Sequence, residues 1–118
     1  MTQEDKELLL VDLSARFPYN VAIDCRSEDS RFTCYLTTDM LREIQNNTNY
    51  WEYKPFLFPF SSMTEEQYEN FLLTDSKITL KGVICSTKVF EFLNKYHFDY
   101  RGLIPMDLAN DATGLNIY

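Results

Sequence analysis

Two prolines bracket the most apolar stretch of the chain and restrict its fold more than any other feature. The segment Pro55–Phe60 holds three phenylalanines and a leucine. Proline fixes φ and has no N–H, so this segment cannot be helical and cannot be a fully paired central strand. Burial stabilises such side chains by roughly 1.5–3 kcal/mol each. We therefore predict an extended segment inside the core, with Pro59 at an edge or at the end of strand pairing.

A helix is predicted to begin directly after this segment, over Glu65–Leu73. Thr64 fits the N-cap position, and Gln67 fits the third helical position of a capping box. Met63 and Tyr68 fit the two positions of a hydrophobic staple. These residue types explain the stretch as a structural element.

The N-terminal segment predicts a first helix, capped by Thr2, that runs to about Arg16 and is stopped by Pro18. Leu9 and Leu13 lie on its apolar stripe. Three charged residues fall largely off this stripe: Lys6, Asp12 and Arg16.

Two alternating segments, 20–26 and 31–37, predict an antiparallel hairpin around a polar turn. A turn centred on residues 28–29 places Cys25 opposite Phe32 and Ile23 opposite Cys34. The two cysteines then become diagonal neighbours on the buried face. The other face of the first strand, which carries Asp24, is expected to be the exposed one.

The remaining segments complete an expected α+β fold in which a small antiparallel sheet of three to five strands packs with three helices. Residues 38–45 fit either a short helix or a third strand, Met40–Ile44, and the strand is favoured because it would extend the hairpin. Ile78–Cys85 is β-like, and Lys88–His97 is helical. We expect a single domain over residues 1–118, with a loosely ordered tail from about residue 110 on which Leu115, Ile117 and Tyr118 can dock.

The charge of the chain bears on its partners. The formal net charge is −7 and the isoelectric point is about 4.6. Lys and Arg are scattered singly, whereas direct nucleic-acid binding needs a basic patch. There is no apolar run of membrane-spanning length, and the first residues are acidic where a signal peptide is basic. We expect a cytoplasmic protein that binds neither nucleic acid nor membrane directly.

The cysteine content argues against a metal site or a disulfide framework. The three cysteines are Cys25, Cys34 and Cys85, an odd number without a CxxC motif. Reduced, buried thiols are the expected state. We expect no cofactor and no metal.

The segment around the single histidine, His97, is one candidate site. His97 and Asp99, together with Cys85, would suit a small hydrolase or transferase if they met in a pocket. A histidine at a helix end beside an aspartate is also a common structural arrangement. Tyr100 and Arg101 can likewise serve recognition, or they can hold the helix end in place.

A second candidate is the aromatic group that precedes the proline-bracketed segment. Tyr50, Trp51 and Tyr53 lie within four residues of one another. Trp and Tyr are favoured at the centres of protein interfaces. These side chains form either an exposed aromatic patch or part of the packing against the sheet.

Three sequence elements resemble a family of short, functionally uncharacterised proteins from Bacteroidales bacteria, their phages and mobile elements. The elements are Ala15–Tyr19 (ARFPY), Lys54–Gln67 (KPFLFPFSSMTEEQ) and Leu93–Ile104 (LNKYHFDYRGLI). Phe58 departs from the family pattern, which has a basic residue there. The resemblance implies a phage-associated or mobile-element protein and no particular chemistry.

The sequence therefore favours a non-enzymatic accessory protein that binds another protein. One alternative is an acidic inhibitor that imitates nucleic acid, which requires Asp and Glu to cluster on one face. A second alternative is the small hydrolase or transferase that uses His97.

Overall fold

The structure, a computed structural model, describes residues 1–46, 50–69 and 87–118. They form an α+β fold whose four-stranded sheet has the order β2-β1-β3-β4. The elements are α1 (Gln3–Arg16), β1 (Ala22–Arg26), β2 (Arg31–Tyr35), α2 (Thr38–Gln45), β3 (Glu52–Leu57), a helix seen over 65–69, α4 (Thr87–Lys95) and β4 (Asn110–Asp111). Short 3-10 turns, Phe17–Tyr19 and Phe60–Ser62, follow α1 and β3. The predicted β-like segment Ile78–Cys85 lies outside the described residues.

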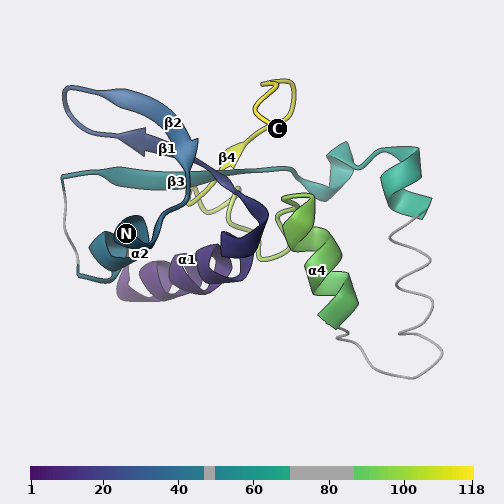
Figure 1. The fold of residues 1–118 in the computed structure, drawn as a ribbon, viewed down its shortest axis with the longest axis horizontal. Coiled ribbons are helices and arrows are strands. Elements are labelled where there is room, and N and C mark those ends of the chain that lie inside the picture. Colours follow the sequence, from purple (N-terminus) through teal and green to yellow (C-terminus); the bar gives the residue numbers. More distant parts are fainter. Residues whose placement is uncertain (47–49, 70–86) are drawn as a thin grey trace.

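Helices α1 and α2 lie side by side on one face of the sheet (Figure 1), and Ala112 and Ile117 near the end of the chain pack on the other face. β1 pairs antiparallel with β2 and with β3, whereas β4 is short and runs parallel to β3. The sheet is therefore mostly antiparallel, which confirms the predicted α+β class. No helix among the described residues is long and apolar enough to cross a membrane.

The hairpin register is the predicted one. Cys25 lies opposite Phe32, and Ile23 lies opposite Cys34. The turn is closed by hydrogen bonds between Ser27 and Ser30, at 2.8 Å between the Ser27 N–H and the Ser30 carbonyl. The alternation of apolar residues and the polar turn were thus sufficient to set the pairing.

The prediction of a third strand over Met40–Ile44 is wrong, because these residues lie in α2. The Thr37 hydroxyl accepts a hydrogen bond from the Met40 N–H at 3.3 Å and caps the helix. Met40 and Ile44, four residues apart, face the core together. The second edge of β1 is taken by β3.

The proline-bracketed segment is extended, as predicted, but only its first half is buried. Pro55, Phe56 and Leu57 are inside, whereas Phe60 is 46% exposed. β3 lies between β1 and β4, yet β4 pairs only with Phe56 and Leu57, directly after Pro55. The strand is therefore interior without being fully paired on both sides, as the missing proline N–H requires.

The helix after this segment begins with the predicted capping box. The Thr64 hydroxyl accepts from the Gln67 N–H at 3.1 Å, and the Gln67 side chain accepts from the Thr64 N–H at 3.0 Å. Tyr68 is 52% exposed. Met63 packs beside Leu93 and Phe98.

The first helix also begins at the predicted cap, Thr2, and Asp5 completes a capping box that was not predicted. Its buried face differs from the prediction: Asp12 and Arg16 are fully buried and Lys6 is nearly so. The amphipathic pattern predicts that these three residues are exposed, because it assigns charged side chains to the solvent-facing side of a helix. Asp12 and Arg16 pair with each other, and the further partners of all three residues come from distant segments.

Strand β1 is buried on both faces, which corrects the expectation of one exposed face. Ala22 and Asp24 are at most 3% exposed. Phe56, Ala112 and Ile117 pack with Ala22 on the second face. The C-terminal segment, predicted as a loose tail, carries β4 and covers this face.

Tyr118 fastens the end of the chain to the sheet. Its hydroxyl accepts a hydrogen bond from the Ala22 N–H at 2.8 Å and donates one to the Phe56 carbonyl at 2.7 Å. Leu115, by contrast, is 53% exposed. Of the three tail residues expected to dock, Tyr118 makes the specific contact.

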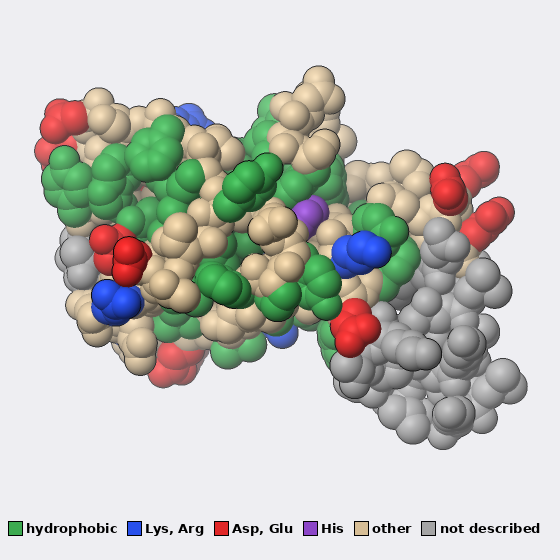
Figure 2. Space-filling model, viewed as in Figure 1, with side chains coloured by type: hydrophobic (Ala, Val, Ile, Leu, Met, Phe, Trp, Pro, Cys, Tyr) green, Lys and Arg blue, Asp and Glu red, His purple; other side chains and the backbone are tan. Residues whose placement is uncertain are grey.

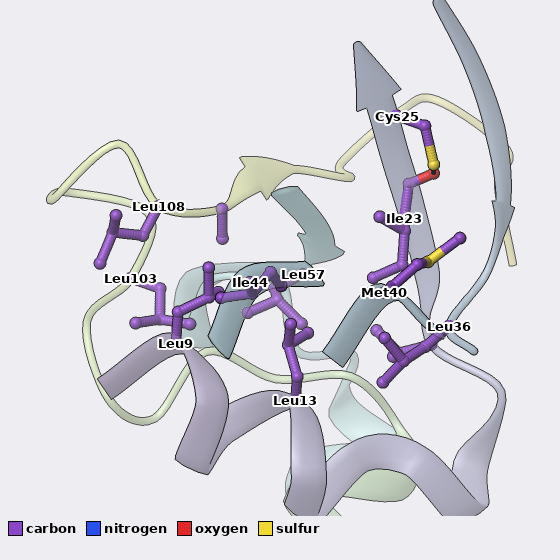
Figure 3. Close-up of a cluster of buried hydrophobic side chains, with 12 residues drawn as sticks. Leu9, Leu13, Ile23, Cys25, Leu36, Met40, Ile44, Leu57, Leu103 and Leu108 are labelled. Atoms are coloured by element: carbon purple, nitrogen blue, oxygen red, sulfur yellow. Dashed lines mark hydrogen bonds between the residues drawn. The ribbon is translucent and has the colours of Figure 1, made fainter. Parts of the chain in front are cut away.

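The main core lies between the sheet and the two N-terminal helices (Figure 3). Its buried side chains come from helices, strands and the segment after α4: Leu9, Leu13, Val21, Ile23, Cys25, Leu36, Met40, Ile44, Leu57, Leu103, Leu108 and Ala109. A smaller cluster forms around Leu93 and Phe98, where α4 meets the end of β3.

Replacing Leu13, which is fully buried, by alanine should lower the free energy of unfolding by about 2–5 kcal/mol, because it leaves a cavity in the main core. Val11→Ala is the matched control on the same helix, since Val11 is 56% exposed. Urea denaturation measures both changes. Equal effects from the two substitutions would contradict the assigned face of α1.

Candidate functional site

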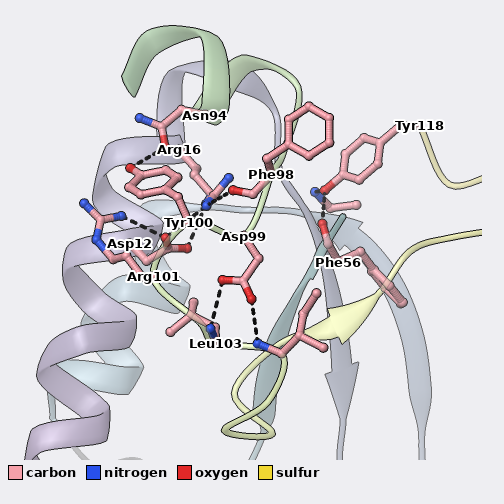
Figure 4. A network of polar contacts seen from close by, with 12 residues as sticks. Asp12, Arg16, Phe56, Asn94, Phe98, Asp99, Tyr100, Arg101, Leu103 and Tyr118 are labelled. Atoms are coloured by element: carbon pink, nitrogen blue, oxygen red, sulfur yellow. Dashed lines mark hydrogen bonds and ion pairs between the residues drawn. The ribbon is translucent and has the colours of Figure 1, made fainter. Parts of the chain in front are cut away.

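A buried ion-pair network joins the last turn of α1 to the segment after α4 (Figure 4). The Asp12 carboxylate accepts from Arg16 Nε at 2.8 Å and from Arg16 Nη2 at 3.1 Å. The same carboxylate accepts from Arg101 Nη1 at 2.8 Å. One fully buried carboxylate thus holds two guanidinium groups, which leaves the centre with a net positive charge.

Backbone and aromatic groups complete this network. Arg16 Nη2 also donates to the Phe98 carbonyl at 2.6 Å. The guanidinium carbons of Arg16 and Arg101 lie 5.1 and 4.6 Å from the centroid of the Tyr100 ring, within cation–π range. The Tyr100 hydroxyl donates to the Asn94 side chain at 2.8 Å. Tyr100 and Arg101 were predicted to serve either recognition or the structure of the helix end. Their contacts stabilise the packing of α4 against α1, which is the structural role.

Asp99 stabilises the chain reversal that follows α4. Its two carboxylate oxygens accept from the Leu103 N–H at 2.8 Å and the Ile104 N–H at 2.9 Å. Gly102, in this reversal, has a φ of +76°, a conformation that glycine adopts without strain. Asp99 is used as a backbone cap and does not orient His97.

Helix α4 ends at Lys95, two residues before the predicted end at His97. His97 therefore lies just beyond the helix. Its φ is +63°, so it acts as the left-handed residue that ends the helix. The ring is 8% exposed and stacks on Tyr118 at 3.8 Å between centroids. Burial, with a further contribution from the charge of Arg16, lowers the pKa of His97 to about 4. The imidazole is therefore neutral at pH 7.

The described residues around His97 do not form a catalytic dyad with it. Nδ1 of His97 has no hydrogen-bond partner among the described residues, and the nearby carboxylate of Asp99 is bound to backbone amides. Cys85, the proposed nucleophile, lies outside the described residues. The structure thus brings His97, Asp99, Tyr100 and Arg101 together, but in roles that hold the helix end.

The second candidate, the aromatic group, divides into a buried and an exposed part. The Tyr53 hydroxyl donates to the Glu43 carboxylate on α2. Burial and this carboxylate raise the pKa of Tyr53. Tyr53 therefore packs between the sheet and α2 and is not an exposed recognition residue.

Trp51 belongs to an exposed aromatic patch, which we define as Phe32, Tyr50 and Trp51. The Trp51 ring lies edge-to-face on Phe32 at 5.1 Å and on Tyr50 at 5.4 Å between centroids. Phe32 is 48% exposed and Tyr50 is 65% exposed. Hydrophobic side chains gather over this hairpin end of the molecule in Figure 2.

Phe32 is the member of the patch that sequence reasoning missed. The alternation of β2 placed it on the buried face, and it does lie on that face, opposite Cys25. Its ring is nevertheless not covered, since Phe32 is 48% exposed. Cys25 lies between Phe32 on β2 and Tyr53 on β3. Trp51 lies two residues before Tyr53. The predicted pairing of Cys25 with Phe32, together with this spacing, was the available signal that Phe32 belongs to the patch.

An open pocket of about 410 Å³ lies between the start of α1, β3 and the segment before β4. Its charged lining includes Lys54, which is already paired with Asp107 at 3.0 Å and with Glu52 at 3.3 Å. Among the described residues no group of three or more His, Cys, Asp or Glu side chains is placed to hold a metal ion. The lysine of the pocket is already engaged by two carboxylates.

The acidic side chains on the face shown in Figure 2 lie in separate groups. Several carboxylates are also paired with basic residues: Asp24 with Arg31 at 3.0 Å, and Asp39 with Arg42 at 3.4 Å. A continuous acidic face, which imitation of nucleic acid requires, is not present on this side.

Comparison with models of known protein families, with curated protein sequences and with solved structures finds no match. The geometry of the chain is therefore the basis for assigning a role.

Replacing Asp12 by asparagine should lower the free energy of unfolding by about 3–5 kcal/mol, because two guanidinium groups then lose their buried counter-charge. Asp39→Asn is the control: its pair with Arg42 has side chains 77% and 68% exposed, and such pairs contribute little. Guanidinium chloride denaturation measures both. A small effect at Asp12 would contradict a stabilising role for the network.

The depressed pKa of His97 predicts a loss of stability in acid. The unfolded chain binds a proton near pH 6.5 and the folded chain near pH 4, so acidification between these values favours unfolding. The full difference is on the order of 3 kcal/mol. Unfolding measured from pH 7 to 4 should show a steeper loss for the natural protein than for His97→Asn, which suits the left-handed backbone.

The imidazole titration followed by NMR provides the direct check, and His97 is the single histidine of the chain. A midpoint near 4 is expected. A midpoint near 6.5 would show that the ring is not buried as described.

Proposed function

We propose that this chain is a non-enzymatic protein-binding module that contacts its partner through the aromatic patch of Phe32, Tyr50 and Trp51. The observation that carries the proposal is the contact of the Trp51 ring with the rings of Phe32 and Tyr50, both of which are at least 48% exposed. Clustered, exposed aromatic side chains are typical of interaction sites.

The surroundings of the patch support binding by a prearranged surface. Trp51 packs against the main core, and its edge-to-face contacts orient the Phe32 and Tyr50 rings. Side chains that are already ordered lose less conformational entropy when a partner binds. The patch also lies beside β2, which is an outer strand of the sheet.

The setting of this role is an accessory function in the cytoplasm of a bacterium, of the phage or mobile-element kind. The resemblance of the ARFPY, KPFLFPFSSMTEEQ and LNKYHFDYRGLI elements supports this setting. The absence of a reactive constellation among the described residues around His97 is consistent with a binding role rather than catalysis.

Affinity purification from the cells in which the protein is naturally expressed tests the role. The double variant Phe32→Ser, Tyr50→Ala should reduce recovery of the specific partner by at least about tenfold, because truncation of central aromatic residues costs about 2 kcal/mol or more. Quantitative mass spectrometry of the co-purified proteins measures the change, and circular dichroism confirms that the variant is folded.

Tyr35→Ala is the matched control, because Tyr35 is 60% exposed on the same strand and points to the opposite face from Phe32. It should leave recovery unchanged. If the double variant retains every protein that the control retains, the patch is not the binding surface.

A further inference from the structure

Two cysteine side chains from neighbouring strands meet on the helix-covered face of the sheet. Sγ of Cys25 on β1 lies 3.2 Å from Sγ of Cys34 on β2. Their diagonal relation follows from the register, in which Cys25 opposes Phe32 and Cys34 opposes Ile23. A disulfide has an S–S distance of about 2.05 Å, so closure requires an approach of about 1 Å.

We propose that Cys25 and Cys34 form an oxidation site at which hydrogen peroxide converts the two thiols into a reversible disulfide. The proposal goes beyond the binding role and does not depend on it. It rests on the contact between the two sulfur atoms and on the difference between their surroundings.

The two thiols are unequally exposed, which assigns them different parts in the reaction. Cys34 is half-buried, and Cys25 is completely buried. Burial, with a further contribution from Cys34, raises the pKa of Cys25 to about 12. Cys25 therefore remains protonated at neutral pH, and Cys34 is the thiol that peroxide reaches first.

The reaction takes place in two steps. The Cys34 thiolate attacks one oxygen of hydrogen peroxide, the O–O bond breaks, and Cys34 becomes a sulfenic acid while hydroxide leaves. The sulfur of Cys25 then attacks the Cys34 sulfur; the S–O bond breaks, and the Cys25 proton leaves with the departing hydroxyl as water. In total two thiols and one peroxide give one disulfide and two water molecules, and a thiol reductant such as dithiothreitol reverses the change.

The position of the pair gives the disulfide a structural consequence. β2 is an outer strand whose described contacts to the sheet run through β1, so the bond would fix the outer strand to its neighbour. Cys25 lies directly opposite Phe32, a member of the aromatic patch. In a reducing compartment such a bond is expected to be transient.

Peptide mapping after oxidation tests the proposal. The reduced natural protein is treated with one equivalent of hydrogen peroxide, and free thiols are then blocked with N-ethylmaleimide. Trypsin places Cys25 in peptide 17–26 and Cys34 in peptide 32–42, so the disulfide appears as one linked pair. The expected result is this linked pair in monomeric protein, with a mass decrease of about 2 Da that dithiothreitol reverses.

Two comparisons, one with the unfolded protein and one with a cysteine variant, distinguish oxidation directed by the fold from incidental oxidation. The linked pair should form at least about tenfold faster in the native protein than in urea, because the fold holds the sulfurs in contact. In Cys25→Ser, Cys34 should stop at the sulfenic acid, which dimedone traps. Equal rates in both conditions, disulfides between molecules, or two thiols that remain free for the blocking reagent would each overturn the proposal.

Discussion

The buried carboxylate of Asp12 is the contact on which the arrangement of the helices depends. It binds Arg16 within α1 and Arg101 from the segment after α4, 89 residues later in the chain. Arg16 in turn reaches the Phe98 carbonyl. A buried charge network stabilises a fold only while every member has its partner, so this centre fixes one orientation of α4 relative to α1 and disfavours others.

A second set of contacts closes the sheet on its other side. Tyr118 bridges backbone groups of β1 and β3, and β4 adds a short parallel edge. His97, which follows α4, stacks on the Tyr118 ring. The segment that joins α4 to the charge network therefore also contacts the last residue of the chain. Both faces of β1 are consequently covered, which explains why a strand with alternating polarity is buried at every position but its last, Arg26.

The two candidate sites therefore have different physical characters. The segment from His97 to Arg101 is committed to internal contacts, since its carboxylate, guanidinium and phenol groups all have partners within the fold. The aromatic patch lies at the hairpin end of the sheet, and the thiol pair lies beside it on the helix-covered face, with Cys25 fully buried. Binding and chemical modification are most readily accommodated there, because neither requires the charge network to open.

The sequence by itself determined the local elements. Three local features follow from residues close together in the chain: the capping boxes at Thr2 and Thr64, the hairpin register, and the extended backbone at Pro55. Over such short separations, hydrogen-bonding and steric rules apply directly. Residues 38–45 show the limit of this reasoning, since Met40 and Ile44 suit a strand or a helix until the position beside β1 is known to be occupied by β3.

Only the tertiary structure decided the roles of the charged and aromatic residues. Asp12 and Arg16 look like surface residues on a helical projection. They are buried because Phe98 and Arg101, which are more than 80 residues later in the chain, pack against them and bind them. Phe32 looks like a core residue by alternation, yet it is 48% exposed in the folded chain. Periodicity assigns a side chain to a face, whereas the rest of the fold determines whether that face is covered.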